Sequence, residues 1–320
     1  MLEMSGSLRR GTVGDFPGNK NFAFSIFDDT DDSTVANIAP IYRLLSELGF
    51  LTTKSVWPLA SVDAGLSGGS SLAEKDYRAF VVALQAEGFE IGLHNVRNHS
   101  ATREVVEHGF EQFRSVLGDY PRIQANHEFN EDNIYWGADR FSITGLKWGY
   151  RVLARFWRQS GFSGHDENSP YFWGDLCAKR VTYVRNLVFD EINLLRINPT
   201  LPYHDPSKPY VNFWFSSCEG ATVESFCKML CEANQDRLEQ EGGVCIMYTH
   251  FAYGFCDDGV LHSTFEGLMR RLVKKKGWFV PVATLLDYLR ARRGDNDIPQ
   301  RELVGMECRW LLSKLRRGRS

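Results

Sequence analysis

Acidic and imidazole side chains follow four separate apolar segments of this sequence. They are Asp28, Asp29, Asp31 and Asp32 after FAFSIF, His94 and His99 after or near EIGL, His127 after RIQAN, and His250 after GVCIMYT. Divalent ions take carboxylate and imidazole ligands and keep one position open for water. A second carboxylate can then act as general base, and a histidine as general acid. One such residue at the end of a strand is usually a cap, but four together favour a metal-dependent hydrolase.

The four aspartates within five positions are the strongest of these signals. Like charges this close repel each other, and a nearby cation offsets the repulsion. We expect only part of the cluster to serve the site. Asp31 and Asp32 are expected to begin the following helix, where acidic side chains interact favourably with the helix dipole.

The elements that must position these residues alternate along the chain. Apolar segments typical of strands alternate with amphipathic segments typical of helices. The strand-like segments span 21–27, 50–57, 89–94, 122–127, 211–217, 243–250 and 277–282. Such alternation predicts a parallel sheet covered by helices, with ligands bound at the carboxyl ends of the strands.

The length of 320 residues suits one large α/β domain. We predict a single (β/α) barrel over residues 21–293, with an irregular insertion around residues 127–212. Residues 1–20 are expected to form a flexible N-terminus, and residues 294–320 a basic C-terminal helix or tail. The C-terminal segment RWLLSKLRRGRS is basic and amphipathic, which indicates either a solvated tail or weak contact with an anionic membrane surface.

Composition narrows the class of protein further. The net charge of −3 gives no overall attraction to nucleic acid, and no apolar run is long enough to form a transmembrane segment. The N-terminus lacks the apolar core of a signal peptide. Seven cysteines without a metal-binding spacing are typical of reduced thiols. Together these features predict a cytoplasmic protein.

Three of the motifs resemble those of the polysaccharide deacetylases, the NodB-homology or carbohydrate esterase family 4 proteins. They are FSIFDDTDDS, GFEIGLHNVRNHS and GGVCIMYTHF, and the resemblance extends from about residue 21 to residue 289. In that family, the first aspartate of the first motif is the base and the second binds metal. The resemblance therefore implies Asp28 as base and Asp29 as a metal ligand.

The other two motifs supply the histidines of the implied site. The resemblance makes His94 and His99 further ligands of Zn²⁺ or another divalent ion, and His250 the general acid. It also implies the fold of the family, a distorted (β/α) barrel, in agreement with the alternation of elements.

Departures from the family pattern leave a second possibility open. The family's two histidines are four residues apart, but Asn98 stands four after His94, and Thr30 replaces the family's glycine. The arginine-proline motif after the fourth strand is absent, and ANHEFNEDN stands there instead. His127 in that segment is a candidate to replace a lost group, as a ligand or as a substrate contact. A metal-independent hydrolase of C–N bonds on the same scaffold thus remains an alternative.

The substrate implied by the resemblance is an acylated amino sugar or a sugar-linked intermediate. Aromatic side chains stack on sugar rings while polar groups bind hydroxyls. Tyr171 and Trp173 in SGHDENSPYFWGD, and Phe251 next to His250, are candidates for this role, although aromatic side chains also fill cores. A catalytically silent carbohydrate-binding protein is the remaining hypothesis.

Overall fold

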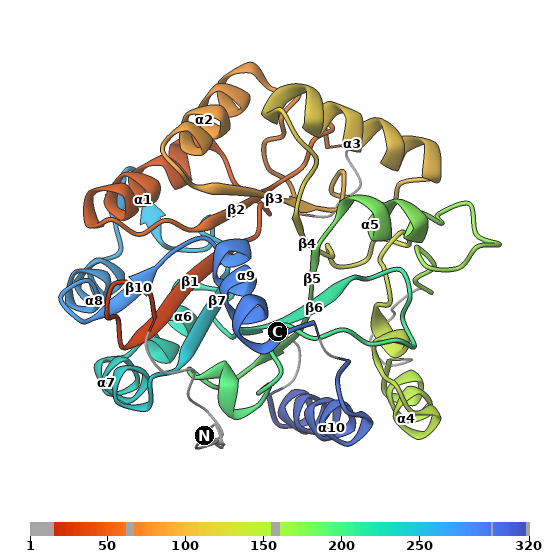
Figure 1. Cartoon of the computed structure of the whole chain (residues 1–320). Coiled ribbons are helices and arrows are strands. Elements are labelled where there is room, and N and C mark those ends of the chain that lie inside the picture. Colours follow the sequence, from red (N-terminus) through yellow and green to blue (C-terminus); the bar gives the residue numbers. More distant parts are fainter. Residues whose placement is uncertain (1–15, 62–66, 155–160, 296, 318–320) are drawn as a thin grey trace, which may run out of the picture.

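The computed structural model describes residues 16–61, 67–154, 161–295 and 297–317. Its main sheet is parallel and closes on itself through the pairing of β1 with β7 (Figure 1). The strands are β1 (Phe22–Asp28), β2 (Thr53–Val56), β3 (Glu90–His94), β4 (Ile123–Ala125), β5 (Tyr183–Phe189), β6 (Phe213–Cys218), β7 (Val244–Thr249) and β10 (Gly277–Phe279). The predicted distorted (β/α) barrel is confirmed.

Helices cover the outside of this barrel and connect consecutive strands (Figure 1). They are α1 (Val35–Leu48), α2 (Lys75–Ala86), α3 (Arg103–Leu117), α4 (Thr144–Ala154), α5 (Gly174–Arg180), α6 (Val223–Met229), α7 (Glu232–Glu241), α8 (Ser263–Leu272), α9 (Val282–Arg293) and α10 (Gln300–Arg317). A small antiparallel hairpin, β8 (Cys256–Asp257) and β9 (Val260–Leu261), precedes α8. In the described ranges, no helix is both long and apolar enough to span a bilayer.

Strand β1 is the central strand of the fold. It pairs with β7 along one edge, and with β10 and then β2 along the other. All seven of its residues are buried, because one face points into the barrel and the other lies under helices. The acidic cluster therefore begins where a fully buried strand reaches the rim.

The segment 127–212, predicted to be irregular, also contributes to the barrel. Its described part begins with loop, a 3-10 turn at Gly137–Arg140 and helix α4, and α5 and β5 follow. β5 pairs with β4 on one side and with β6 on the other. The barrel is therefore continuous through this segment, and the sequence interpretation missed one of its strands.

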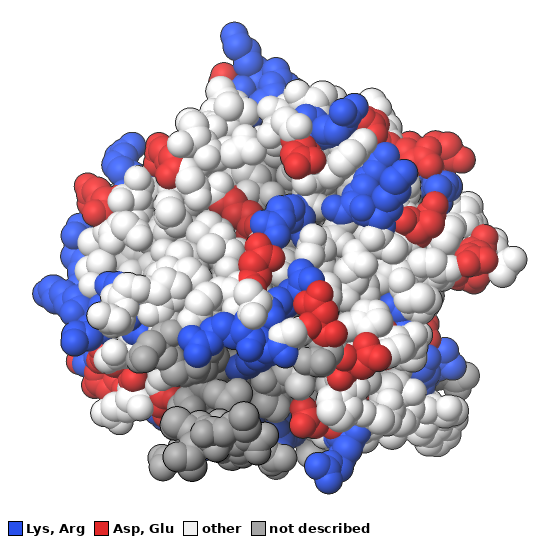
Figure 2. All heavy atoms as spheres, viewed as in Figure 1, with Lys and Arg blue, Asp and Glu red and all other residues white. Residues whose placement is uncertain are grey.

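Helix α9 crosses the barrel at the amino ends of the strands (Figure 1). The amide of Val282 donates to Thr53 Oγ1 at 2.9 Å, and Asp287 accepts from Arg122 and from the Tyr183 hydroxyl at 2.8 and 2.6 Å. Figure 2 shows acidic and basic side chains interspersed over this face. Helix α9 and its charged hydrogen-bond partners thus cover the end of the barrel opposite the candidate site.

The two chain ends differ in how far the structure describes them. The flexible N-terminus predicted for residues 1–20 lies mostly outside the described residues, although Phe16 is buried and pairs with Lys20. In the C-terminal segment, α10 packs its inner face on the core through Leu303, Met306 and Trp310.

Close packing of α3 against the loop after β3 holds the histidine-bearing rim in place. A Cβ added to Gly109 in α3 would lie 2.4 Å from Cγ1 of Val96, and Val96 is itself buried. Real Cβ atoms do not approach this closely, so a glycine is required for α3 to reach the loop.

We therefore expect Gly109→Ala to destabilise the protein by about 1–3 kcal/mol, because Val96 must move in a packed core. Gly267→Ala in α8 is the matched control, since nothing lies within 4 Å of a Cβ at that position. The control should be neutral or stabilising by up to about 1 kcal/mol, as alanine is the better helix former. Urea unfolding of both variants measures the difference, and equal stability would contradict the packing argument.

Candidate metal centre

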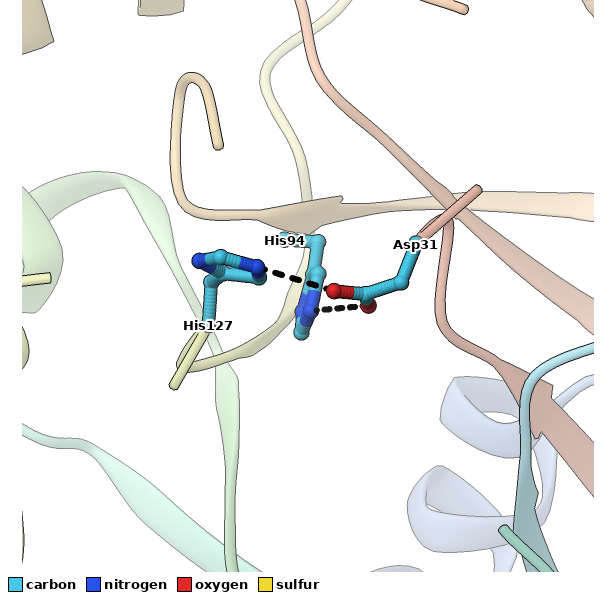
Figure 3. Close-up of side chains that lie close together, drawn as sticks. All are labelled: Asp31, His94 and His127. Atoms are coloured by element: carbon cyan, nitrogen blue, oxygen red, sulfur yellow. Dashed lines mark ion pairs between the residues drawn. The ribbon is translucent and has the colours of Figure 1, made fainter. Parts of the chain in front are cut away.

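A buried carboxylate lies between two imidazoles at the carboxyl ends of the strands. Asp31 follows β1, His94 is the last residue of β3, and His127 comes two residues after β4. Nε2 of His94 lies 3.0 Å from Asp31 Oδ2, and Nε2 of His127 lies 2.8 Å from Asp31 Oδ1. Figure 3 shows the carboxylate directed toward both rings. All three side chains are buried.

A third histidine approaches the same carboxylate from β7. His250 comes directly after this strand, and its Nε2 lies 3.4 Å from Asp31 Oδ2 and 4.0 Å from Asp29 Oδ2. Its exposed fraction of 9% is the largest among the site's acids and imidazoles, compared with 5% for Asp31. The His250 side is therefore the side on which the centre is most open.

Each of the three imidazoles has its other nitrogen bound to a fixed oxygen. Nδ1 of His94 lies 3.2 Å from the carbonyl of Ala125, and Nδ1 of His250 lies 3.0 Å from the carbonyl of Ala221. Carbonyl oxygens only accept hydrogen bonds, so both Nδ1 atoms carry the proton. Each Nε2 is then free to bind a metal or a second proton.

His127 is oriented in the same way through a side-chain amide. Its Nδ1 lies 3.0 Å from Asn130 Oδ1, while the amide nitrogen of Asn130 donates to the carbonyl of Arg97. That second bond assigns the oxygen of Asn130 to His127, so Nδ1 of His127 is the donor. A hydrogen bond from the outer ring nitrogen to a fixed oxygen sets the tautomer and direction of metal-ligating histidines.

A network of asparagines holds the loop that carries His127. Asn95 accepts from the His127 amide at 2.7 Å and donates to Asp132 at 2.7 Å, and Asn133 donates to the His127 carbonyl at 2.6 Å. Asn95 adopts a left-handed backbone conformation with φ of 49°, which asparagine tolerates better than most residues. The polar segment ANHEFNEDN thus fixes the position of one imidazole.

The charges at this centre are those that a cation would balance. Burial by itself raises the pKa of Asp31, but His94, His127 and His250 together hold it well below its ordinary range. Burial also opposes protonation of His127 and His250, yet hydrogen bonding to Asp31 raises the pKa of both imidazoles. Asp31 is therefore ionised, and it stabilises positive charge on its neighbours.

The donor set fits a divalent ion. Among the described residues, Asp31, His94 and His127 form one group of possible ligands, and Asp29, Asp31 and His250 form another, each with its ligand atoms within 4.8 Å of one another. Asp31 Oδ2 is buried and faces Nε2 of His94 and Nε2 of His250, at 3.0 and 3.4 Å. Three Nε2 atoms directed at this carboxylate require either added protons or a cation.

The two first aspartates of the cluster have different partners. Arg185 of β5 donates to both carboxylate oxygens of Asp29, at 2.8 and 2.5 Å, and its guanidinium lies over the rings of Tyr248 and Phe27. Burial raises the pKa of Asp29, but Arg185 and His94 more than offset this, so the pKa is lowered. Asp29 is thus an ionised carboxylate held at the edge of the centre.

Asp28 instead belongs to a buried ion pair outside the two candidate ligand groups. Its Oδ2 lies 3.0 Å from Nζ of Lys54 and accepts from the Tyr42 hydroxyl, and its Oδ1 accepts from the amide of Phe251. Both charged side chains are fully buried. These contacts use both oxygens of Asp28 in holding the fold together.

Some of the residues predicted for the site lie in the centre, and others lie outside it. The structure brings Asp29, His94 and His250 together with His127 and with Asp31, which was expected to begin a helix. Helix α1 instead starts at Val35, with Thr34 as its N-cap.

His99 lies outside both ligand groups, and its Nδ1 lies 3.0 Å from Asn98 Oδ1. The predicted substrate contacts have mixed positions. Trp173 is 1% exposed and donates to the carbonyl of Asp132, and Phe251 is 0% exposed and packs on Tyr42. Both side chains therefore fill the core, because neither offers surface to a ligand. Tyr171 is half-buried.

Two important residues were not found from the sequence. Asp31 was assigned to a helix start, although the third acid after a strand is still within reach of the rim. Arg185 was missed along with β5, whose segment TYVRNLVF is rich in strand-forming residues and was the available signal. The family's arginine-proline motif is absent from the sequence, and the guanidinium beside Asp29 comes instead from Arg185.

Comparison of the whole fold with solved structures gives several matches at low sequence identity. A protein assigned as a polysaccharide deacetylase from Mycobacterium smegmatis is 12% identical, with a TM-score of 0.53, covering 91% of this chain and 98% of its own. Another so assigned from Pseudomonas aeruginosa is 12% identical, with a TM-score of 0.51, covering 88% and 95%. The chain has the fold of the polysaccharide deacetylases. This confirms the resemblance of the motifs at the level of the fold.

The same fold also carries other chemistry. Puue allantoinase matches with 11% identity and a TM-score of 0.53, covering 88% of this chain and 94% of its own. No protein-family model matches the chain, and no curated protein matches it in sequence. Because likeness at this identity concerns the fold alone, function has to be argued from the site.

We expect Lys54→Met to destabilise the protein by about 3–5 kcal/mol at neutral pH, because it leaves the Asp28 carboxylate buried without its counter-charge. Burial already raises the pKa of Asp28. The deficit should therefore grow as the pH rises and shrink as Asp28 takes up a proton in acid. Denaturant unfolding between pH 4 and pH 8 measures this trend.

The double variant Asp28→Asn/Lys54→Met is the control for that experiment. It removes both charges, so it should recover most of the stability at pH 8 and lose the pH trend. If the single and double variants are equally unstable, the ion pair does not account for the effect.

Proposed function

We propose that this chain is a metal-dependent hydrolase that removes an acyl group from an amino sugar or a sugar-linked intermediate. The observation that carries the proposal is the convergence of three Nε2 atoms on the carboxylate of Asp31. Asp31, His94 and His127 would hold Zn²⁺ or another divalent ion. The fold, shared with proteins assigned as polysaccharide deacetylases, supports an acyl-group hydrolase.

The proposed ligand set differs from the one that the motifs imply. His127 takes the place of His99, which belongs to neither ligand group, and Asp31 takes the place of Asp29, because Asp31 belongs to both groups and Asp29 only to the one with His250. Asp29 keeps a position beside the centre, with Oδ2 3.8 Å from His94 Nε2. A divalent ion bound there supplies a Lewis acid, which lowers the pKa of a coordinated water toward neutrality.

The protein's own groups then divide the proton transfers between them. In hydrolysis of an amide, the oxygen of water bonds to the acyl carbon, the C–N bond breaks, and the amine leaves with an added proton. Asp29 is ionised and fixed by Arg185, so it is suited to accept the proton of the water. His250 has the most open position and lies 4.0 Å from Asp29, so it is suited to protonate the leaving nitrogen.

A second candidate, a metal-independent C–N hydrolase, is favoured by a specific observation. Hydrogen bonding to Asp31 raises the pKa of both His127 and His250. Arg185 already pairs with Asp29, so a single imidazolium group would balance Asp31 without any ion. Metal content separates the two candidates directly.

We expect the purified chain to bind about one zinc ion, and Asp31→Ala and His127→Ala each to lose it, because a ligand set reduced to two holds zinc poorly. His99→Ala is the matched control and should keep the ion. Elemental mass spectrometry after incubation with zinc and desalting gives the metal content. No bound ion, or hydrolysis of acylated amino sugars that survives a chelator, would favour the metal-independent candidate.

Asp29→Asn should keep the ion in the same elemental measurement. Its kcat for hydrolysis of acylated amino sugars should fall about 10²–10⁴-fold, because the substitution removes the group that accepts the proton. Full activity in this variant would show that Asp29 is not the base and that another residue accepts the proton.

Metal affinity should fall as the pH is lowered from 8 to 6. A proton occupies His127 below its raised pKa, and zinc has to displace that proton from Nε2 of this ligand. The loss should reach about tenfold per displaced proton for each pH unit below the pKa. Calorimetric titration in buffers of different ionisation enthalpy counts the protons released. An affinity that does not change with pH would contradict a histidine-rich ligand set.

A further inference from the structure

Exposed apolar side chains gather on two helices away from the candidate site. Among the described residues, the large exposed hydrophobic side chains are Trp148 at 70%, Val152 at 39%, Leu312 at 54%, Leu315 at 52%, Val82 at 40% and Val260 at 71%. The first two belong to α4 and the next two to α10. The others lie singly on α2 and on the β8–β9 hairpin, and single exposed apolar residues are ordinary.

Helices α4 and α10 lie side by side and expose their outer faces (Figure 1). Ring centroids of Tyr150 on α4 and Trp310 on α10 are 6.3 Å apart, and both rings are buried. Trp148 precedes Tyr150 by two positions and Leu312 follows Trp310 by two, which places each on the opposite side of its helix. The apolar side chains thus face outward from one helix pair.

Both helices carry an excess of basic residues. The two helices together contain seven lysines and arginines and two glutamates, in a chain with a net charge of −3. Arg309 on α10 is exposed, and the Arg151 side chain on α4 is 65% exposed and lies 3.6 Å from Asp139. On the face crossed by α9, by contrast, the two signs are interspersed (Figure 2).

We propose that the outer faces of α4 and α10 bind the surface of a bilayer that contains anionic lipids. Tryptophan and leucine on one side of a helix, flanked by lysine and arginine, are the features that place a helix in the interfacial plane of a membrane. Negative headgroups attract the excess positive charge. A second copy of the chain is a poorer partner, because its matching face would carry the same positive charge.

The end of α10 lies toward the rim of the barrel that carries the candidate site. Lys314, near the end of this helix, interacts electrostatically with Glu219 and Glu128. Glu128 is next to His127, and Glu219 follows β6. The proposal does not depend on which reaction the site catalyses.

Vesicle flotation of the full chain tests this surface. The wild type should float with vesicles of equal parts phosphatidylglycerol and phosphatidylcholine, and much less with phosphatidylcholine alone or in 0.5 M salt. The double variant Leu312→Asp/Leu315→Asp should weaken binding at least about tenfold, because it removes two side chains that insert and adds negative charge. Trp148→Asp should weaken it as well, from the other helix.

Val260→Asp is the matched control, because it alters an equally exposed apolar residue on the distant hairpin. It should bind vesicles as the wild type does. Circular dichroism melting of each variant confirms that the fold is kept, and Trp148→Asp provides an independent test if the α10 variant unfolds. The proposal is overturned if the wild type does not bind phosphatidylglycerol vesicles, or if Val260→Asp weakens binding as much as the two helix variants do. Light scattering tests whether the wild type is a dimer. The proposal is also overturned if the helix variants dissociate such a dimer but float with the vesicles as the wild type does.

Discussion

The structure depends on one electrostatic arrangement, the carboxylate of Asp31 with three imidazole nitrogens directed at it. Each histidine comes from a different strand end, and each has its Nδ1 fixed by an oxygen of the protein. None of the three rings can turn its Nε2 away without losing that bond. A buried carboxylate this close to imidazoles needs protons or a cation as well, since lone pairs alone would repel it. The rim of the barrel is therefore built around a position for positive charge.

The alternation of side chains along a strand explains how adjacent aspartates come to have separate roles. Successive residues of a strand point to opposite faces. Asp28 contacts Tyr42 of α1, so its side chain lies on the outer face of the barrel, under the helices. Asp29 contacts Arg185 of β5, which is not a neighbour of β1, so this pair meets across the barrel interior. The outer aspartate is paired with Lys54, and the inner one lies beside the candidate metal centre.

Sequence patterns predicted the parts of this molecule that depend on local order. The strands from β1 to β4, β6, β7 and β10 were found because each is an apolar run followed by a helical pattern or a polar turn. His94, His127 and His250 were found because they stand at the ends of such runs. These elements could be predicted from the sequence without knowledge of the contacts across the barrel.

What the sequence could not provide were the contacts between residues far apart in it. Arg185 is 156 positions from Asp29, and no spacing rule connects them. The second histidine of the family pattern was sought near His94, where His99 stands one residue beyond the family's separation of four. Helix α3 begins only at Arg103, so residues 95–102 have no helical turn that would direct His99 to the centre. The imidazole in the ligand group comes instead from the neighbouring strand end, through His127.

The sharing of Asp31 between two groups of ligands links the proton on His250 to the occupancy of the centre. Without a cation, Asp31 stabilises positive charge on both His127 and His250, and this raises the pKa of each. A cation held by Asp31, His94 and His127 would offset the charge of that carboxylate and leave Asp29, 4.0 Å away, as the ionised acid nearest to His250. The pKa of His250 would then be lower than it is without the ion. A histidine that binds its proton less tightly when the centre is filled is better able to donate it to a leaving nitrogen near neutral pH. The same carboxylate would thus assemble the ligands and adjust the acid beside them.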